Sequence, residues 1–169
     1  YGPEEGLLVA MPQLTGPLST YTAIWDIKFD ALPSFQALLQ TDTAQGNDGD
    51  FFVRSDSGLG INGDYDGSVQ IDTWHRIAVT VEDLGNGSAT LSKYLDGAFL
   101  DSQTVDSSRF TLDPTTGFLL LTENDGETGT GHLAHFALSE TVLTAPEVLA
   151  LGGADAAGPL AATPAVAPT

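Results

Sequence analysis

Short runs of alternating apolar and polar residues, separated by clusters of Gly, Asp, Asn and Pro, dominate the chain. In residues 21–30, Trp25 shares one face of an extended chain with other apolar residues, while Asp26, Lys28 and Asp30 share the opposite face. Residues 75–83 alternate in the same way. Because successive side chains of a strand point to opposite faces, both segments are predicted to be half-buried strands.

The same kind of pattern predicts eight further strands, at residues 6–11, 37–41, 51–55, 58–63, 89–95, 98–105, 118–122 and 132–139. Asp96-Gly97 is typical of a tight hairpin, since both residue types tolerate positive φ, and residues 84–89 indicate a second hairpin. Many short strands punctuated by turn signals are typical of a sandwich. The sequence therefore predicts an all-β fold, a two-sheet antiparallel β-sandwich of the jelly-roll type.

One short C-terminal helix is predicted after these strands. Thr144 followed by Glu147 forms a capping-box pattern, Pro146 lies in the first turn, and Gly152 and Gly153 end the helix. Beyond it the chain is rich in Ala, Pro and Thr and has no periodicity. The predicted organisation is one sandwich domain over residues 1–155 and a tail or linker over 156–169.

Charge and composition restrict the partners. The chain has 169 residues, with 23 Asp+Glu against 5 Lys+Arg and a net charge of −18. That charge repels nucleic acid and anionic membrane surfaces. No apolar stretch is long enough to span a bilayer, and no Cys is present. Because the chain begins with Tyr1 and not with Met, we interpret it as a processed or excised piece of a longer polypeptide. The expected location of the protein is extracellular or periplasmic.

Three motifs carry a family resemblance. They are Trp74-His75 at the start of a strand, Tyr94-Leu95-Asp96-Gly97 about twenty residues later, and the segment from Leu143 to Leu151. The region that contains these motifs, about residues 6–153, resembles the laminin-G-like, concanavalin A-like family. Within it, residues 118–127 resemble modules attached to secreted bacterial phosphoesterases and other exoenzymes. The resemblance implies a module that binds carbohydrate or protein, or supports a neighbouring enzyme domain, often with one calcium ion at the rim.

Three acidic loops offer oxygen ligands for calcium, which takes six to eight oxygens. Their candidate ligands are Asn47, Asp48 and Asp50; Asn62, Asp64 and Asp66; and Glu123, Asn124, Asp125 and Glu127. The second loop opens like an EF-hand, but its twelfth position is Thr73, so it is interpreted as an exposed turn.

The first and third loops each border a predicted strand, and the loops of a sandwich gather at two rims. We therefore predict a structural calcium ion shared between them, with Asn47, Asp48, Asp50, Asp125 and Glu127 as ligands. The alternative is that both loops are ordinary turns of an acidic protein.

Carbohydrate contact requires an exposed aromatic ring. Trp25 and Trp74 are predicted to lie in the core, which leaves Tyr65 and Tyr94 as the predicted ligand-binding residues. Phe51 and Phe52 are adjacent, so one of them is expected to point away from the core.

Other chemistries find little support in the sequence. His132 and His135 are three residues apart, on opposite faces of a regular strand, so zinc is not predicted. Asp26, Lys28 and Asp30 are a poor match for a glycosidase carboxylate pair, and no G-x-S-x-G motif occurs.

The predicted function is a non-catalytic binding module of a secreted bacterial protein, binding a glycan or supporting a neighbouring domain of the same polypeptide. The alternatives are a structural or assembly domain that contacts other protein chains, and a glycoside hydrolase or lyase on the same fold.

Overall fold

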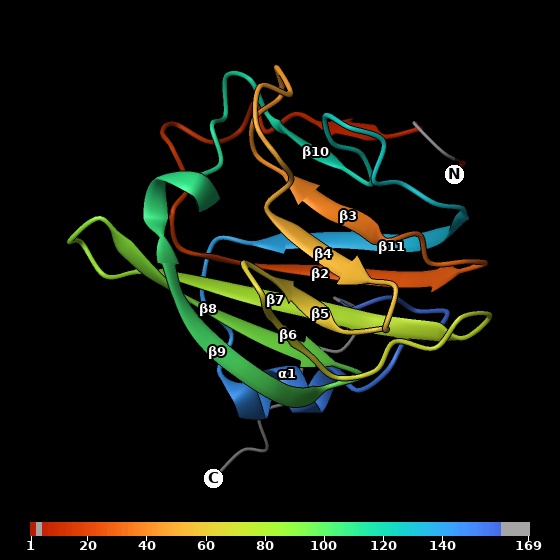
Figure 1. The fold of residues 1–169 in the computed structure, drawn as a ribbon. Coiled ribbons are helices and arrows are strands. Elements are labelled where there is room, and N and C mark those ends of the chain that lie inside the picture. Colours follow the sequence, from red (N-terminus) through yellow and green to blue (C-terminus); the bar gives the residue numbers. More distant parts are fainter. Residues whose placement is uncertain (3–4, 160–169) are drawn as a thin grey trace, which may run out of the picture.

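The computed structural model describes residues 1–2 and 5–159. This part of the chain forms eleven strands, one 3-10 helix and one α-helix (Figure 1). The strands are β1 (Leu7–Val9), β2 (Tyr21–Phe29), β3 (Phe35–Gln40), β4 (Phe51–Arg54), β5 (Leu59–Ile61), β6 (Asp64–Asp66), β7 (Trp74–Asp83), β8 (Ser88–Leu95), β9 (Ala98–Asp106), β10 (Phe118–Leu120) and β11 (Gly131–Ser139). The helices are η1 (Ser107–Phe110) and α1 (Ala145–Leu151).

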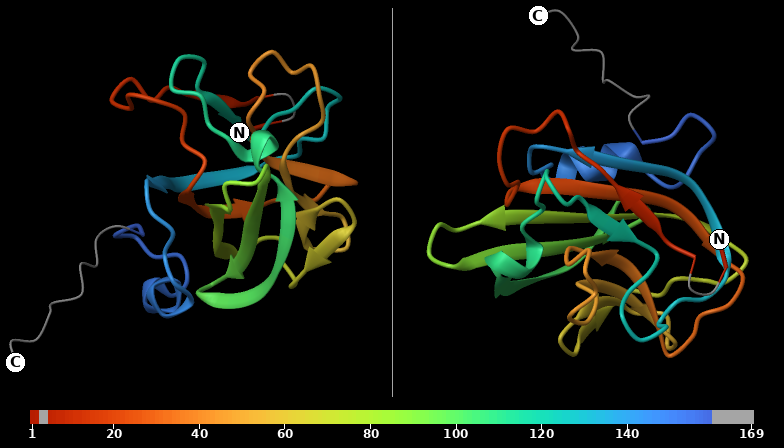
Figure 2. Two further views of the ribbon diagram at one scale, coloured as in Figure 1. Left: turned by 90° about the vertical axis from the view of Figure 1, so that its left-hand side faces the viewer. Right: turned by 90° about the horizontal axis from the view of Figure 1, so that it is seen from above.

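Two antiparallel sheets face each other (Figure 2). One has six strands in the order β1-β10-β3-β4-β5-β6, and the other has five in the order β11-β2-β7-β8-β9. The apolar faces of the alternating strands meet between the sheets in one continuous core, which includes Trp25, Phe51, Val79 and Phe118. The predicted two-sheet β-sandwich is confirmed.

The tight turns follow the sequence signals. Asp96 and Gly97 join β8 to β9 with φ values of 51° and 84°, as a hairpin of the predicted kind requires. Asn62 and Gly63 join β5 to β6 in the same way, with φ values of 54° and 86°. Strand β6 itself was not predicted, because Asp is a poor strand former.

Helix α1 packs on the outer face of the five-stranded sheet, away from the six-stranded one (Figure 2). The predicted capping box is present, and the Glu147 carboxylate accepts a hydrogen bond from the Thr144 backbone N–H at 2.8 Å. Under the helix lies a second apolar cluster of Ile24, Ala78, Tyr94, Ala137 and Val148. No helix of the described part is long and apolar enough to cross a membrane.

This packing corrects the prediction that β2 is half-buried. Its polar-face residue Asp26 is 0% exposed and binds the Arg76 guanidinium through both carboxylate oxygens, at 2.7 and 2.8 Å. Arg76 in turn donates a hydrogen bond to the backbone carbonyl of Leu151, at the end of α1. Strands β2 and β7 are therefore buried on both faces over most of their length, and Lys28 and Trp74, which lie beyond the helix, stay at least partly exposed. The alternation of a strand does not reveal such a cover, because the helix comes from a distant part of the chain.

The prediction that a tryptophan lies in the core is confirmed for Trp25 and wrong for Trp74. Trp25 is fully buried in the main core, as predicted. Trp74, also predicted to be a core residue, is 44% exposed, since it lies at the very start of β7 on its outer face. Phe51 belongs to the core between the sheets, whereas Phe52 points to the opposite face of β4, where it is also buried.

The boundary after residue 155 is not visible as a break in the described part. Residues 156–159 continue from the turn after α1, and Gly158 lies against the His135 ring. The remainder of the predicted tail, residues 160–169, lies outside the described residues.

Candidate metal and glycan site

Two segments distant in sequence meet beside β3, an inner strand of the six-stranded sheet. Strand β3 lies between β4 and β10, so the β3–β4 loop and the segment after β10 both border it. The backbone N–H of Ala37 in β3 donates to the carbonyl of Glu127 at 2.8 Å, and the N–H of Gly129 donates to the Gln36 side chain at 2.6 Å. These bonds hold the 121–130 segment against β3. The predicted convergence of the two loops is therefore observed.

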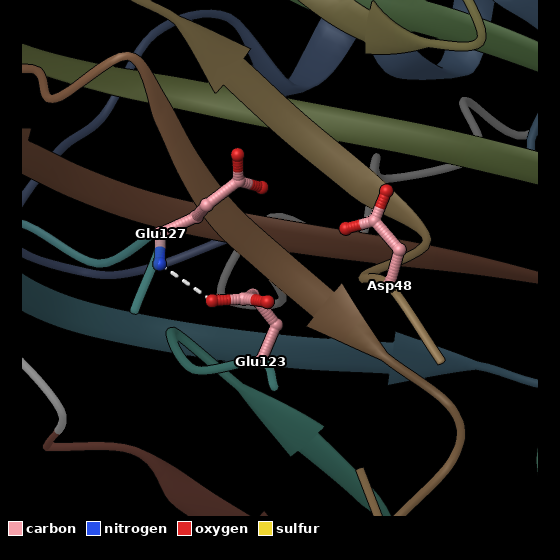
Figure 3. Close-up of side chains that lie close together, drawn as sticks. All are labelled: Asp48, Glu123 and Glu127. Atoms are coloured by element: carbon pink, nitrogen blue, oxygen red, sulfur yellow. Dashed lines mark hydrogen bonds between the residues drawn. The ribbon is translucent and has the colours of Figure 1, made fainter. Parts of the chain in front are cut away.

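Three carboxylates from the two loops lie together: Asp48, Glu123 and Glu127 (Figure 3). One carboxylate oxygen of each lies within 4.8 Å of the others. Asp48 is exposed, Glu127 is partly exposed, and Glu123 is buried. Glu123 accepts hydrogen bonds from the backbone N–H groups of Asp125, at 2.8 Å, and Glu127. The Glu123 carboxylate thus fixes the backbone of the loop and also adds a negative charge to it.

The electrostatics of this acidic cluster show an excess of negative charge. Burial, the largest cause, and the nearby carboxylates of Asp125, Asp48 and Glu123 together raise the pKa of Glu127 from its ordinary 4.5 to about 7. None of the interactions acting on Glu127 lowers its pKa. A cation at this position would relieve the repulsion.

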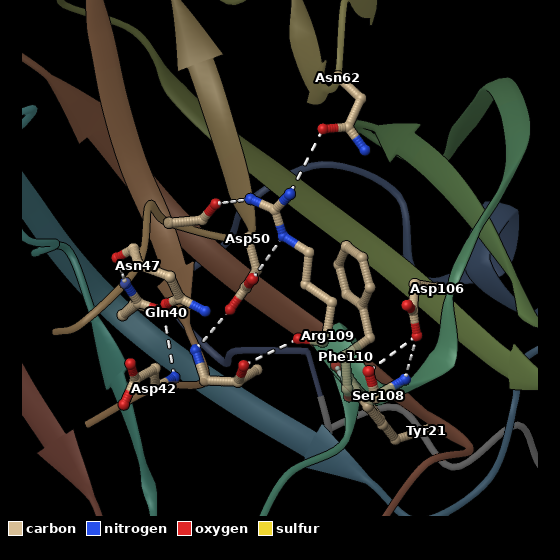
Figure 4. Close-up of polar contacts among 12 residues, drawn as sticks. Tyr21, Gln40, Asp42, Asn47, Asp50, Asn62, Asp106, Ser108, Arg109 and Phe110 are labelled. Atoms are coloured by element: carbon tan, nitrogen blue, oxygen red, sulfur yellow. Dashed lines mark hydrogen bonds and ion pairs between the residues drawn. The ribbon is translucent and has the colours of Figure 1, made fainter. Parts of the chain in front are cut away.

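Asp50, one of the predicted ligands, has another role. Its carboxylate is 0% exposed, accepts from the Thr41 N–H at 2.6 Å, and pairs with the Arg109 guanidinium at 2.8 Å (Figure 4). Arg109 also donates to the Gly49 carbonyl. Asp50 therefore anchors the β3–β4 loop to η1, and we remove it from the candidate ligand set.

The other predicted ligands lie at the margin of the acidic cluster. The carbonyl of Asn47 accepts from the Gln40 amide at 2.8 Å, which fixes the loop backbone rather than presenting the side chain. Asp125 is exposed and acts on Glu127 through its charge, but its carboxylate is not among the three that converge. Glu123, which belonged to the same acidic loop but not to the predicted ligand set, takes its place.

A pocket of about 280 Å³ adjoins this cluster on the outer face of the six-stranded sheet. Its walls include Phe35, Phe52 and Tyr65, with Asp48 and Glu127 on its border. The Phe35 ring centroid lies 5.9 Å from that of Phe52 and 6.0 Å from that of Tyr65. The predicted contact residue Tyr65 is thus partly exposed in an aromatic pocket beside the converging carboxylates.

Local backbone chemistry positions Tyr65. It pairs with Gly60 across β5 and β6, and a side chain at Gly60 would meet the Asp64 carbonyl at 1.8 Å. The Arg54 guanidinium lies 4.5 Å from the Tyr65 ring centroid and also binds Asp56 at 2.8 Å. The Tyr65 ring is therefore held between a glycine-dependent strand pair and a fixed cation.

A second acidic group, Asp64, Asp66 and Asp101, already contains a cation. The ammonium of Lys93, which is 0% exposed, lies 2.6 Å from an Asp64 oxygen and 2.5 Å from an Asp66 oxygen. This lysine supplies the positive charge that a metal ion would otherwise bring. The interpretation of residues 61–67 as an exposed turn is wrong for most of its length, because only Asn62 and Gly63 form the turn and Asp64–Asp66 form the partly buried strand β6.

Tyr94, the other predicted ligand-binding residue, is only 4% exposed. It lies in the apolar cluster under α1, with its ring centroid 5.5 Å from that of Phe99. The helix, which covers this face of β8, removes the ring from solvent. We therefore correct the prediction and exclude Tyr94 from the site.

The histidines and the Asp26 face offer no alternative centre in the described residues. His132 and His135 were expected on opposite faces, but a β-bulge at Ala134 places them opposite Lys28 and Asp26, on one face. Neither belongs to a group of metal-ligating residues. Asp26 is paired with Arg76, so it does not provide a free catalytic carboxylate.

Comparison with known proteins places this geometry in a family. Residues 11–149 match the laminin G profile described as the Concanavalin A-like lectin/glucanases superfamily. No curated protein sequence matches the chain.

Solved structures share the fold at low sequence identity. A heptameric SAP-like pentraxin from Limulus polyphemus is 16% identical with a TM-score of 0.54, over 79% of this chain and 70% of its own. A protein from Bacteroides ovatus, provisionally named a carbohydrate binding protein, is 17% identical with a TM-score of 0.60, over 93% of this chain and 48% of its own. Trypanosoma rangeli sialidase is 13% identical with a TM-score of 0.62, over 89% of this chain and 26% of its own.

This chain therefore spans about half of the Bacteroides protein and about a quarter of the sialidase. The sandwich topology, the match over residues 11–149 and these neighbours agree: the chain belongs to the Concanavalin A-like lectin/glucanases superfamily.

Proposed function

We propose that this chain is a non-catalytic carbohydrate-binding module of a secreted protein, located outside the cell or in the periplasm. The glycan binds in the pocket beside Tyr65. The single observation that carries this proposal is the contact between two features: Asp48 and Glu127 belong both to the aromatic pocket and to the acidic cluster. Aromatic rings beside polar oxygens are the surroundings that a sugar ring and its hydroxyls require. The Bacteroides ovatus neighbour supports the same reading.

Calcium is the proposed structural ion of the acidic cluster. Calcium is a hard cation that takes carboxylate, carbonyl and water oxygens, and Asp48, Glu123 and Glu127 bring three carboxylates from two loops to one place. The raised pKa of Glu127 fits a position that lacks a counter-charge. When bound, calcium would offset two of the negative charges of the cluster and fix the two loops that border the pocket.

Thermal melting tests the calcium proposal. A ligand that binds only the native state at 100 times its Kd stabilises it by roughly 2.7 kcal/mol. For a domain of this size we expect the Tm to rise by roughly 5–10 °C on going from chelator to saturating calcium. In Asp48→Asn and Glu127→Gln the rise should shrink to a degree or two, whereas Glu140→Gln, an exposed carboxylate elsewhere, should behave as the wild type.

A glycan array tests the binding proposal separately. The fluorescently labelled protein should bind at least one class of glycan in calcium, and Tyr65→Ala should weaken that binding at least tenfold. An array without signal, with and without calcium, would overturn the carbohydrate assignment. An unchanged Tm in calcium would overturn the metal assignment while leaving the glycan assignment to the array.

A glycoside hydrolase is the second candidate, and one observation favours it. Glu127, with a pKa of about 7, has the protonation expected of a general acid, and an Asp48 oxygen lies within 4.8 Å of a Glu127 oxygen. We prefer binding because a cation would lower this pKa: burial is its largest cause, but a cation would remove the repulsion from Asp125, Asp48 and Glu123 that adds to it. Release of reducing sugar by the wild type, lost in Glu127→Gln, would reverse the preference.

A further inference from the structure

The second exposed aromatic surface lies on the other sheet. The bulge in β11 brings His132 opposite Lys28 of β2, and Lys28 lies opposite Trp74 of β7. These three side chains form one row across three strands, on the outer face of the five-stranded sheet. The ring centroids of Trp74 and His132 are 6.4 Å apart, with the rings inclined by 55°.

Helix α1 leaves this row uncovered. The helix covers the single row that contains Ile24 and Ala78, and its last carbonyl, that of Leu151, is bound by Arg76 one row further along. The next row, which contains Trp74, lies beyond the helix: the Trp74 residue is 44% exposed and the His132 side chain 56% exposed. Trp74 is thus an exposed aromatic ring on the part of this sheet that the helix does not cover.

A cation and a carboxylate lie in or beside this row. The Asp30 carboxylate, 40% exposed, lies 3.2 Å from the His132 ring nitrogen Nε2 and 3.8 Å from the Lys28 ammonium. The other four cations of the chain have closer carboxylate partners: Arg54, Arg76, Lys93 and Arg109 lie within 2.8 Å of theirs. Lys28 is thus the cation with donor capacity to spare, and Asp30 beside it is an exposed acceptor.

We propose that Trp74, His132, Lys28 and Asp30 form a second glycan platform, which takes a neutral sugar. The apolar face of a pyranose would stack on the Trp74 ring, while Lys28 donates to, and Asp30 accepts from, neighbouring hydroxyls. One cation beside one carboxylate leaves no net charge for an anionic sugar, and the −18 charge of the chain repels one. The platform is on the sheet opposite the Tyr65 pocket, so the module would contact glycan on two faces.

Tryptophan fluorescence gives a selective test. Of the two tryptophans, Trp25 is fully buried and Trp74 is 44% exposed, so acrylamide quenching reports on Trp74. The probes are neutral β-1,4-linked gluco-, manno- and xylo-oligosaccharides, with an oligogalacturonate as the anionic comparison. At least one neutral probe should reduce the quenching constant about twofold or more, and this protection should persist in chelator and in Tyr65→Ala.

Variants complete the test. In affinity electrophoresis with the corresponding polysaccharide in Tyr65→Ala background, Trp74→Ala should weaken binding at least tenfold. Phe99→Ala, which removes another exposed aromatic residue of the same sheet (51% exposed), should change it less than twofold. The emission of buried Trp25 reports whether Trp74→Ala is folded.

The proposal is overturned if no neutral probe protects Trp74, if the anionic probe protects it instead, or if Trp74→Ala and Phe99→Ala behave alike. Loss of protection in Tyr65→Ala or in chelator would also overturn it, because the ligand would then lie in the first pocket. If glycan binding fails only at the Tyr65 pocket, the proposal for the Trp74 platform is unaffected.

Discussion

Glu127 shows how strongly position changes the chemistry of a single residue. Many of the 23 acidic residues are exposed turn formers, but Glu127 combines partial burial with three acidic neighbours. Its raised pKa means that the folded state disfavours the ionised form. Between pH 4.5 and about 7 the folded protein therefore holds a proton that the unfolded chain has lost, so this group's contribution to stability falls as pH rises through that range.

We accordingly expect that, in chelator, Glu127→Gln loses less thermal stability than the wild type between pH 5 and pH 8. Circular dichroism melts at one-unit pH intervals measure the difference. Saturating calcium should cancel it, since the ion replaces the missing counter-charge. Glu140→Gln serves as the control, and parallel pH profiles for wild type and Glu127→Gln would refute the expectation.

Among the elements, α1 has the largest effect on the molecule for its length. Seven residues help to bury the outer face of β2 up to Asp26, while Lys28 beyond it stays partly exposed, and they remove Tyr94 from solvent. The helix is joined to the sheet by one buried side chain, Val148, and by the bond from Arg76 to the Leu151 carbonyl.

Two adjacent helix positions allow a matched experiment. Val148 is 0% exposed, and its replacement by Ala should lower the unfolding free energy by about 1–3 kcal/mol through lost burial and a residual cavity. Leu149 is 64% exposed, and Leu149→Ala should change it by less than about 0.5 kcal/mol. Urea titration gives both values. Equal effects of the two variants would show that the helix does not pack as described.

For the whole molecule, the net charge of −18 destabilises the folded state, because like charges repel one another in a compact structure. Four of the five cations pair closely with particular carboxylates, three of them with buried or partly buried ones, so the remaining acidic residues repel one another over the surface. Salt screens such repulsion, with a Debye length of about 30 Å at 0.01 M and about 8 Å at 0.15 M.

The protein should therefore become more stable as sodium chloride rises from 10 to 500 mM at pH 7.5, with a Tm increase of several degrees. At pH 4, where about half of the carboxylates are protonated, the increase should largely disappear. Scanning calorimetry in chelator separates this general effect from calcium binding. A Tm that is independent of salt at pH 7.5 would mean that local ion pairs already balance the surface charge.

Much of the architecture follows from the sequence alone. Alternation along residues 21–30 and 75–83, the Asp96-Gly97 turn and the Thr144–Glu147 cap all act locally, within a few residues, so each could be recognised without the fold. The shared rim of the two acidic loops was also predictable, because sandwich connections gather at the ends of the sheets.

Only the tertiary structure decided which side chains are free to act. Asp50 and Asp48 are two residues apart in one acidic loop, yet Arg109, 59 positions away from Asp50, binds one and leaves the other in the acidic cluster. Helix α1 buries Tyr94 and stops short of Trp74, and a bulge of one residue moves His135 to the face of His132. Periodicity records which face a side chain takes, whereas what covers that face depends on contacts between distant segments.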